Sequence, residues 1–169
     1  MKRFVCLFSL ILSGCFSHNA RPNLEDTVLI EKQSNQELTK LKKDHCNEPW
    51  YGLYEQKDVV MRVYFEYNRS TVSERDKAIL RSQIIPLLER FKELPILLAG
   101  YTDWNGQETY NEKLGYRRAQ AVADILSQAG ISTERIETIS LGKTCATPNI
   151  DQQAAYQDRR CDVVLKKQH

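Results

Sequence analysis

Histidine is scarce in this 169-residue chain, which has three: His18, His45 and His169. All three lie outside the patterned region from Met61 to Leu165. A His-based hydrolase or a zinc site within that region would therefore lack its usual ligands. No other nucleophile–base pair or metal-ligand set is visible there. The sequence predicts a protein that is not an enzyme and that holds no metal and no cofactor.

A charge excess of either sign is also missing. The formal net charge of +2 includes Lys2 and Arg3, and residues 1–14 contain no acidic residue. A chain that lost these 14 residues would therefore be neutral, which gives no argument for nucleic acid as a partner. The length, with 41% hydrophobic and 27% charged residues, suits one globular domain with appendages, since a typical domain has about 100 to 150 residues.

The N-terminus lacks an apolar run long enough to cross a bilayer as a helix, which takes about 20 residues. Lys2 and Arg3 are followed by a short, mostly apolar stretch from Phe4 to Leu12 and then by Ser13, Gly14 and Cys15. A positive start, a short apolar stretch and small residues are typical of a secretory signal. Residues 1–14 are therefore predicted to be a signal peptide.

The segment Leu12-Ser13-Gly14-Cys15 resembles the lipobox of bacterial lipoproteins, in which the cysteine is lipidated and becomes the first residue of the mature protein. The resemblance implies acyl chains, palmitate among them, on Cys15. Each buried methylene contributes about 0.8 kcal/mol, so several chains hold a domain at a bilayer. Phe16 in place of Asp implies sorting to the cell outer membrane, with the domain facing the periplasm. The alternative is an ordinary secretory signal with a chance cysteine.

Residues 16–48 are polar, with only a weak apolar spacing that suggests a short or marginal helix. Fully extended, this stretch could reach on the order of 100 Å. The sequence thus predicts a signal peptide over 1–14, a lipidated N-terminus and flexible tether over 15–48, and a folded domain over 49–169.

The folded region opens with an alternating pattern at Met61, Val63, Phe65 and Tyr67, which is typical of a half-buried strand. A helix is predicted to begin near Ser73 and to end before Pro95, with Pro86 kinking or dividing it. The apolar residues of this helix recur at roughly helical spacing.

Ile96 to Ala99 is a short continuous apolar run that predicts a strand buried on both faces. Thr109 and Glu112 predict a capping box for the next helix, which should end at Gly130. Two more strands are expected over 135–141 and 161–165. This order, β-α-β-α-β-β, predicts an α/β (α+β) two-layer sandwich with a four-stranded mixed sheet and helices on one face.

Three blocks carry a resemblance to a known family: GYTDWNG at 100–106, NEKLGYRRAQAV at 111–122 and DRRCDVV at 158–164. Their order and spacing resemble the OmpA-like domain family, of the peptidoglycan-associated lipoprotein type. In that family the blocks line a pocket for the diaminopimelate of a peptidoglycan stem peptide. The resemblance implies that Asp103 takes the ammonium group and Arg118 the carboxylate, with Thr102, Asn111 and Arg160 at further pocket positions.

The position of Arg118 in its helix points to the same role. Arg118 lies seven residues after Asn111 and seven before Ile125, a spacing that drifts by only about 20° per heptad on a helix. It should therefore point along the apolar stripe and find a carboxylate of the protein or of a ligand, because an unpaired buried charge is costly. The alternative is an internal ion pair with Asp103 that binds nothing. Arg117 should face solvent.

Four residues depart from the family pattern: Tyr101 replaces a usual His, Gly115 a usual Ser, Asp158 a usual Asn and Cys161 an apolar residue. Asp158 adds a negative charge that could repel a ligand carboxylate or pair with Arg160.

If Cys15 carries lipid, three cysteines remain after the signal peptide, and an oxidising periplasm favours pairing two of them. Cys145 with Cys161 is the predicted pair, because one lies in the loop before the last strand and the other begins that strand. Three free thiols, or Cys46 with a partner, are the alternatives.

The resulting hypothesis is an outer-membrane lipoprotein that anchors the envelope non-covalently to peptidoglycan. Its partners would be peptidoglycan, the outer membrane through the lipid anchor, and possible further envelope proteins. The alternative is an OmpA-like lipoprotein subunit of a larger envelope assembly, such as a secretion, motor or efflux complex.

Overall fold

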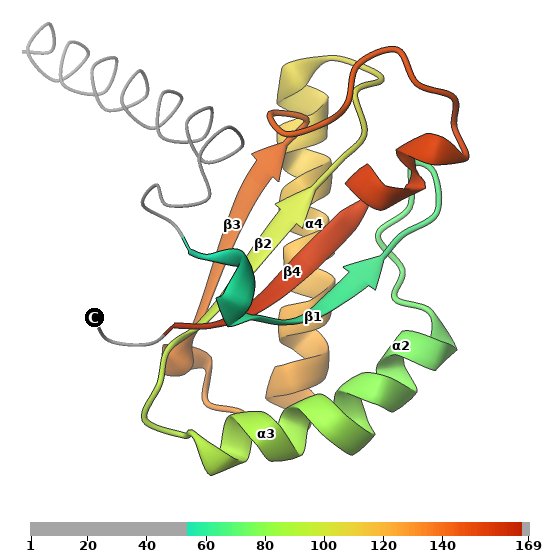
Figure 1. The fold of residues 1–169 in the computed structure, drawn as a ribbon. Helices are drawn as coiled ribbons and strands as arrows, with labels where there is room; N and C mark the ends of the chain where they lie inside the picture. The colour runs from blue at the N-terminus through green and yellow to red at the C-terminus, as the bar shows by residue number, and fades with distance from the viewer. Residues whose placement is uncertain (1–53, 167–169) are drawn as a thin grey trace, which may run out of the picture. The chain divides into compact units, whose positions relative to one another are not determined.

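A four-stranded mixed sheet forms the centre of the domain. The computed structural model describes residues 54–166, so the predicted signal peptide, Cys15 and the predicted tether lie outside the described residues. The strands are β1 (Val59–Tyr64), β2 (Ile96–Tyr101), β3 (Ile136–Gly142) and β4 (Arg160–Leu165), in the order β1-β4-β2-β3 (Figure 1). β4 is antiparallel to β1 and to β2, and β2 is parallel to β3. The predicted mixed sheet is confirmed.

The first helical segment has the start and the division that the sequence predicted. Ser73 caps α2 (Glu74–Ile79), and its hydroxyl accepts a hydrogen bond from the backbone N–H of Asp76. A π-helical turn (Leu80–Ile84) separates α2 from α3 (Ile85–Arg90). Pro86 lies in the first turn of α3, where its missing N–H costs little.

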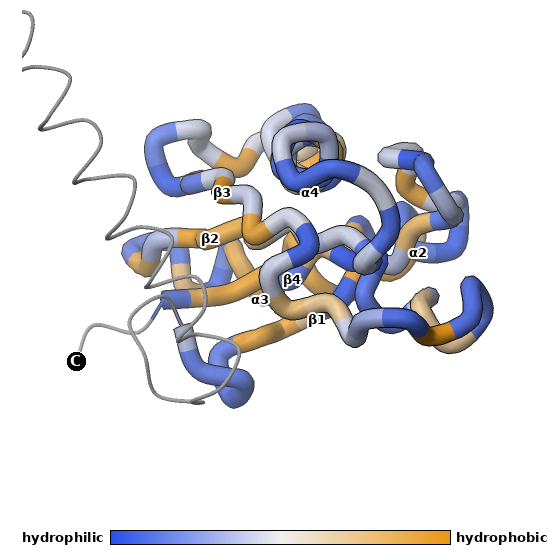
Figure 2. The backbone as a smooth tube through the Cα atoms, turned by 90° about the horizontal axis from the view of Figure 1, so that it is seen from above, coloured by the Kyte–Doolittle hydropathy of each residue, from blue (hydrophilic) through white to orange (hydrophobic). Residues whose placement is uncertain are grey.

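The helices all pack on one face of the sheet. The larger apolar cluster joins α2, α3 and α4 (Glu108–Gln128) to the inward residues of the strands. On β4 these inward residues are Cys161, Val163 and Leu165, whereas Val164 belongs to a second cluster on the other face of the sheet. Figure 2 shows hydrophobic residues along β1 and β2. Within the described residues, no helix is long and apolar enough to cross a membrane.

The alternation along β4 overturns the predicted Cys145–Cys161 disulfide. Cys161 is a free, fully buried thiol on the helix side. Cys145 packs against the cluster on the opposite face of the sheet and is disulfide-bonded. The position of Cys161 near the start of β4 did not indicate on which face of the sheet its side chain would lie.

Two glycines let the backbone of α4 pack directly against the backbone of β2. A Cβ atom on Gly100 would lie 1.9 Å from the carbonyl oxygen of Gly115, and one on Gly115 would lie 2.8 Å from the carbonyl oxygen of Gly100. Real Cβ atoms essentially never come this close, so side chains at these positions would force the helix and the strand apart. Gly115, where the family usually has Ser, therefore sets the depth of α4 on the sheet.

The ends of α4 agree only in part with the sequence prediction. At the C-terminus, Gly130 has φ +98 and donates to Ser127, while Ile131 donates to Leu126, which is the predicted left-handed cap in the form of a Schellman motif. At the N-terminus the predicted capping box is wrong. The N-cap is Gln107 without a side-chain bond, and Thr109 is the second residue of the helix.

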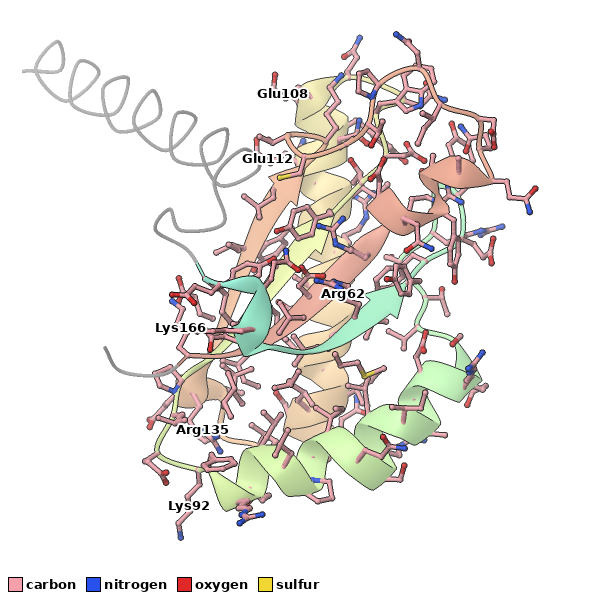
Figure 3. The ribbon with its side chains drawn as sticks, in the orientation of Figure 1. Arg62, Lys92, Glu108, Glu112, Arg135 and Lys166 are labelled. Carbon is pink, nitrogen blue, oxygen red and sulfur yellow. The ribbon has the colours of Figure 1, made fainter. Side chains whose placement is uncertain are left out.

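Arg135 joins the end of α3 to the start of β3. It closes a 3-10 turn (Thr133–Arg135), and its guanidinium donates to the carbonyl oxygens of Leu88, Phe91 and Leu94 (Figure 3). A cation that satisfies the last carbonyls of a helix is a favourable terminus.

Candidate functional site

A small cavity of about 110 Å³ lies where β2 ends and α4 begins. This volume is several times the roughly 10–15 Å³ that one water needs, so a small polar group fits in it. We call it the β2–α4 pocket, and its lining contains four of the five predicted ligand-binding residues. The lining consists of Tyr67, Asn68, Thr102, Asp103, Asn105, Gly106, Tyr110, Asn111, Leu114 and Arg118.

Asp103 supplies a buried carboxylate to this pocket, at 4% exposure. One carboxylate oxygen accepts from Arg159 at 3.2 Å, and the other accepts from the backbone N–H of Asn105 at 3.3 Å. The sequence pattern had not indicated a role for Arg159. Its guanidinium also donates to the carbonyl oxygens of Phe65 and Gln152, and it is itself buried. Asp103 is therefore a charged, oriented group whose position Arg159 fixes.

Arg118 supplies the opposite charge and is fully buried. It donates from Nε to the carbonyl oxygen of Arg69 at 2.9 Å, from Nη1 to that of Tyr101 at 2.7 Å and from Nη2 to that of Glu66 at 3.3 Å. Of the two carboxylate sources expected for Arg118, the protein and a ligand, the protein supplies none among the described residues, and backbone carbonyls accept these three hydrogen bonds instead. A ligand carboxylate stays a prediction. The alternative of an Asp103–Arg118 ion pair is wrong, since Asp103 pairs with Arg159.

The hydrogen-bonding capacity of Arg118 is not exhausted by these contacts. A guanidinium has five N–H donors, and within residues 54–166 three are directed at carbonyl oxygens, which leaves one on each terminal nitrogen. Burial lowers the pKa of Arg118 to about 10, an effect that nearby Asp103 opposes. The side chain is still a cation at neutral pH.

Two predicted residues hold the loop between β2 and α4. The Thr102 hydroxyl donates to the carbonyl oxygen of Asp103 at 3.1 Å, and the Asn111 amide donates to that of Asn105 at 2.8 Å. From the other side, the ammonium group of Lys143 donates to the carbonyl oxygen of Gly106 at 2.7 Å. The pocket wall formed by this loop is thus fastened at several points.

The structure does not bring Arg160, the fifth predicted residue, to the pocket. Its guanidinium lies 3.9 Å from the ring centroid of Tyr101 and pairs with the buried Asp162 at 3.1 Å. Asp162 also accepts from the Tyr54 hydroxyl at 2.7 Å and pairs with Arg62 at 3.5 Å. Arg62 lies on β1 beside this network (Figure 3). Arg160 therefore belongs to a structural network on the helix-free side of the sheet.

Asp158 does not pair with Arg160 either. Its carboxylate accepts from the backbone N–H of Thr147 at 3.0 Å, it lies outside the lining of the β2–α4 pocket, and burial raises its pKa. Arg117 is exposed, as predicted, and lies 5.8 Å from the ring centroid of Tyr110. Among the side chains of residues 54–166, no group of three or more His, Cys, Asp and Glu is placed to hold a metal ion.

Comparison with known proteins gives a match over most of this domain. Residues 64–160 match the model of the OmpA family. The chain is 34% identical over 103 residues to a protein of Legionella pneumophila named peptidoglycan-associated lipoprotein, and 32% identical over 105 residues to one of the same name from Brucella melitensis biotype 1. These alignments cover 60% and 62% of this chain. They span only 58% and 62% of the two relatives.

Solved structures give the same fold. The crystal structure of the peptidoglycan-associated lipoprotein from Burkholderia pseudomallei has a TM-score of 0.59 at 34% identity and covers 62% of this chain and 89% of that one. The C-terminal domain of Helicobacter pylori MotB has a TM-score of 0.58 at 19% identity, covers 64% of this chain and 86% of that one, and shares the fold alone.

Proposed function

The chain belongs to the OmpA family, and on that premise we propose that its domain binds peptidoglycan through the diaminopimelate of the stem peptide. The observation that carries the proposal is the placement of a buried carboxylate and a buried guanidinium, Asp103 and Arg118, in the lining of one small pocket. The zwitterionic end of a diaminopimelate side chain bears an ammonium and a carboxylate on one carbon. An acid and a guanidinium held close together are the groups that such an end requires.

Both charged groups keep hydrogen-bonding capacity for a ligand. A carboxylate has about four acceptor sites, and two of those on Asp103 are used by Arg159 and Asn105. The two remaining N–H donors of Arg118 lie one on each terminal nitrogen, and a guanidinium can engage a carboxylate through such N–H groups. The carbonyl contacts of Arg118 and the arginine contact of Asp103 keep both groups oriented before ligand arrives, which lowers the entropic cost of binding.

The test compares diaminopimelate with lysine, which lacks the second carboxylate. Full-length protein purified in detergent would be titrated with soluble stem peptides that differ only in this residue, and pelleted with isolated sacculi. We expect wild type to bind the diaminopimelate peptide. Asp103→Asn keeps the shape of the side chain and removes its charge, so it should weaken binding by about 2 kcal/mol or more, some 30-fold.

Arg117→Ala is the matched control, because it removes an exposed arginine next to Arg118. It should leave binding of sacculi nearly unchanged. If folded Asp103→Asn protein binds the diaminopimelate peptide as tightly as wild type, the pocket assignment is wrong. If wild-type protein does not bind sacculi, the result would favour a role as a subunit of a larger envelope assembly.

The proposal includes a lipid anchor at Cys15 in the outer membrane, with the domain in the periplasm. It is supported by the resemblance of residues 12–15 to a lipobox and by the names of the relatives. Cys15→Ser should move the protein from the membrane pellet to the soluble fraction after a carbonate wash. A variant that stays in the pellet would contradict the anchor and leave the pocket assignment untouched.

A further inference from the structure

Two tyrosines of the β2–α4 pocket are half exposed. Tyr67 follows β1 and is 50% exposed, while Tyr110 lies in the first turn of α4 and is 45% exposed; both belong to the pocket lining. Segments far apart in the sequence thus bring two aromatic rings to one small opening. Exposed aromatic surface next to a polar cavity is typical of a ligand-binding surface.

Both rings are held in place by their hydroxyl groups. The Asn105 amide donates to the Tyr67 hydroxyl at 2.9 Å, and the Tyr110 hydroxyl donates to the side-chain oxygen of Asn68. Asn105 and Asn68 also line the pocket, so the same polar wall that forms the cavity orients the rings. Rings that are already ordered lose little entropy when a ligand packs on them.

The cavity is too small for more than the end of a side chain, so the rest of a bound stem peptide must lie outside it. In diaminopimelate, three methylenes separate the zwitterionic end from the carbon that belongs to the peptide. Four carbon–carbon bonds of about 1.5 Å, with their usual angles, span about 5 Å. With the zwitterionic end in the pocket, the methylenes and the adjoining peptide bonds therefore lie at its mouth, where the tyrosines are.

We propose that Tyr67 and Tyr110 bind the stretch of stem peptide that adjoins diaminopimelate, so that the domain binds the peptide more tightly than the free amino acid. The inference rests on the proposed function and extends it from the zwitterionic end to its peptide context. The ring faces pack against methylenes and flat amides, while the hydroxyls keep their present partners. Such aromatic contacts change affinity by about three- to tenfold each.

The experiment measures two ligands on each variant by isothermal titration of full-length protein in detergent. The ligands are free meso-diaminopimelate and the soluble tetrapeptide L-Ala–γ-D-Glu–meso-diaminopimelate–D-Ala. Tyr67→Ala and Tyr110→Ala should each lower affinity for the tetrapeptide about three- to tenfold and leave affinity for the free amino acid within about twofold. Tyr67→Phe and Tyr110→Phe, which keep the ring, should retain most of the tetrapeptide affinity.

Tyr116→Ala is the matched control, because Tyr116 is 48% exposed on the same helix and is absent from the pocket lining. It should change neither affinity. Equal losses for both ligands in the alanine variants would overturn the inference, since the tyrosines would then only shape the pocket. Equal affinity of wild type for both ligands would overturn it too and leave the pocket assignment standing. If wild type binds neither ligand, the proposed function itself fails and the inference falls with it.

Discussion

Replacing Gly100 by alanine should damage stability and binding together. The new methyl group would stand 1.9 Å from the carbonyl oxygen of Gly115, whereas ordinary contact begins at 3.4 Å. The atom it meets is backbone, so α4 and β2 must separate by about 1.5 Å or distort by an equivalent amount. A separation of that size would also stretch the 2.7 Å bond from Arg118 to the carbonyl oxygen of Tyr101 beyond hydrogen-bonding range.

Overpacking a core costs about 1 to 3 kcal/mol and occasionally more. We place Gly100→Ala at about 3 kcal/mol or above, because a backbone atom is in the way. Gly115→Ala should cost less, for two reasons. The first reason is that its contacts are less severe: the nearest atom, the Ser140 hydroxyl oxygen, can rotate away, and the carbonyl oxygen of Gly100 lies at 2.8 Å, against 1.9 Å for the contact made by Gly100→Ala. The second is that alanine in place of glycine inside a helix contributes up to about 1 kcal/mol of stability.

Urea unfolding at 25 °C, followed by circular dichroism, measures these differences. With a slope of about 1 to 3 kcal/mol/M, a loss of 3 kcal/mol lowers the midpoint by about 1 to 3 M. Gly130→Ala is the control, because nothing lies within 4 Å of its added methyl group and only its positive φ opposes the change; it should cost about 1 kcal/mol. A Gly100→Ala midpoint equal to that of wild type would refute the described contact between α4 and β2.

Four further predictions concern the buried charges and the cysteines. Asp162→Ala removes the acceptor shared by Tyr54, Arg160 and Arg62 and should lower the free energy of unfolding by about 3 to 5 kcal/mol in urea titrations, whereas a loss below 1 kcal/mol would contradict the network. Burial raises the pKa of Asp158, so its charged form destabilises the fold, and Asp158→Asn should raise the free energy of unfolding at neutral pH. This gain in stability should vanish as the pH falls through the raised pKa toward the unfolded value of about 3.9. Burial also raises the pKa of the Cys161 thiol, so iodoacetamide should label Cys161 only after unfolding, and it should label Cys145 only after reduction. Labelling of Cys161 in the folded protein would count against its burial. Non-reducing peptide mapping should find Cys145 joined to Cys46, because Cys6 lies in the predicted signal peptide and Cys15 is the predicted lipidation site.

Much of the fold could be predicted from the sequence because its elements have strong local patterns. The continuous apolar run of β2 and the long apolar stripe of α4 each admit one interpretation, and Gly130 marks a helix end by its backbone freedom. The capping box at Thr109 failed because the start of α4 depends on longer-range contacts. Asn111 and Lys143 hold the loop at Asn105 and Gly106, and the helix begins where that loop ends.

The site was harder to predict, because its geometry depends on groups that leave no trace in a residue pattern. The partners of Arg118 are backbone carbonyls of the loop between β1 and α2 and of the end of β2, and any residue type can supply them. The choice between Arg159 and Arg160 required the face of each side chain at the start of β4. Strand alternation would have separated the two once the strand was known to begin at Arg160.

The adjacent pair Arg159 and Arg160 places a constraint on how this chain can vary over evolution. Arg159 holds Asp103 in the pocket, and Arg160 completes the Asp162 network on the opposite side of the sheet. A slip of β4 by one residue would turn every side chain to the other face. Arg159 would then lose Asp103, and Arg160 and Asp162, which lie on the same strand, would move together away from Tyr54 and Arg62. Insertions in the loop between β3 and β4 are therefore tolerable only where β4 keeps its register. An insertion or deletion just before Arg159 would impair folding and binding together.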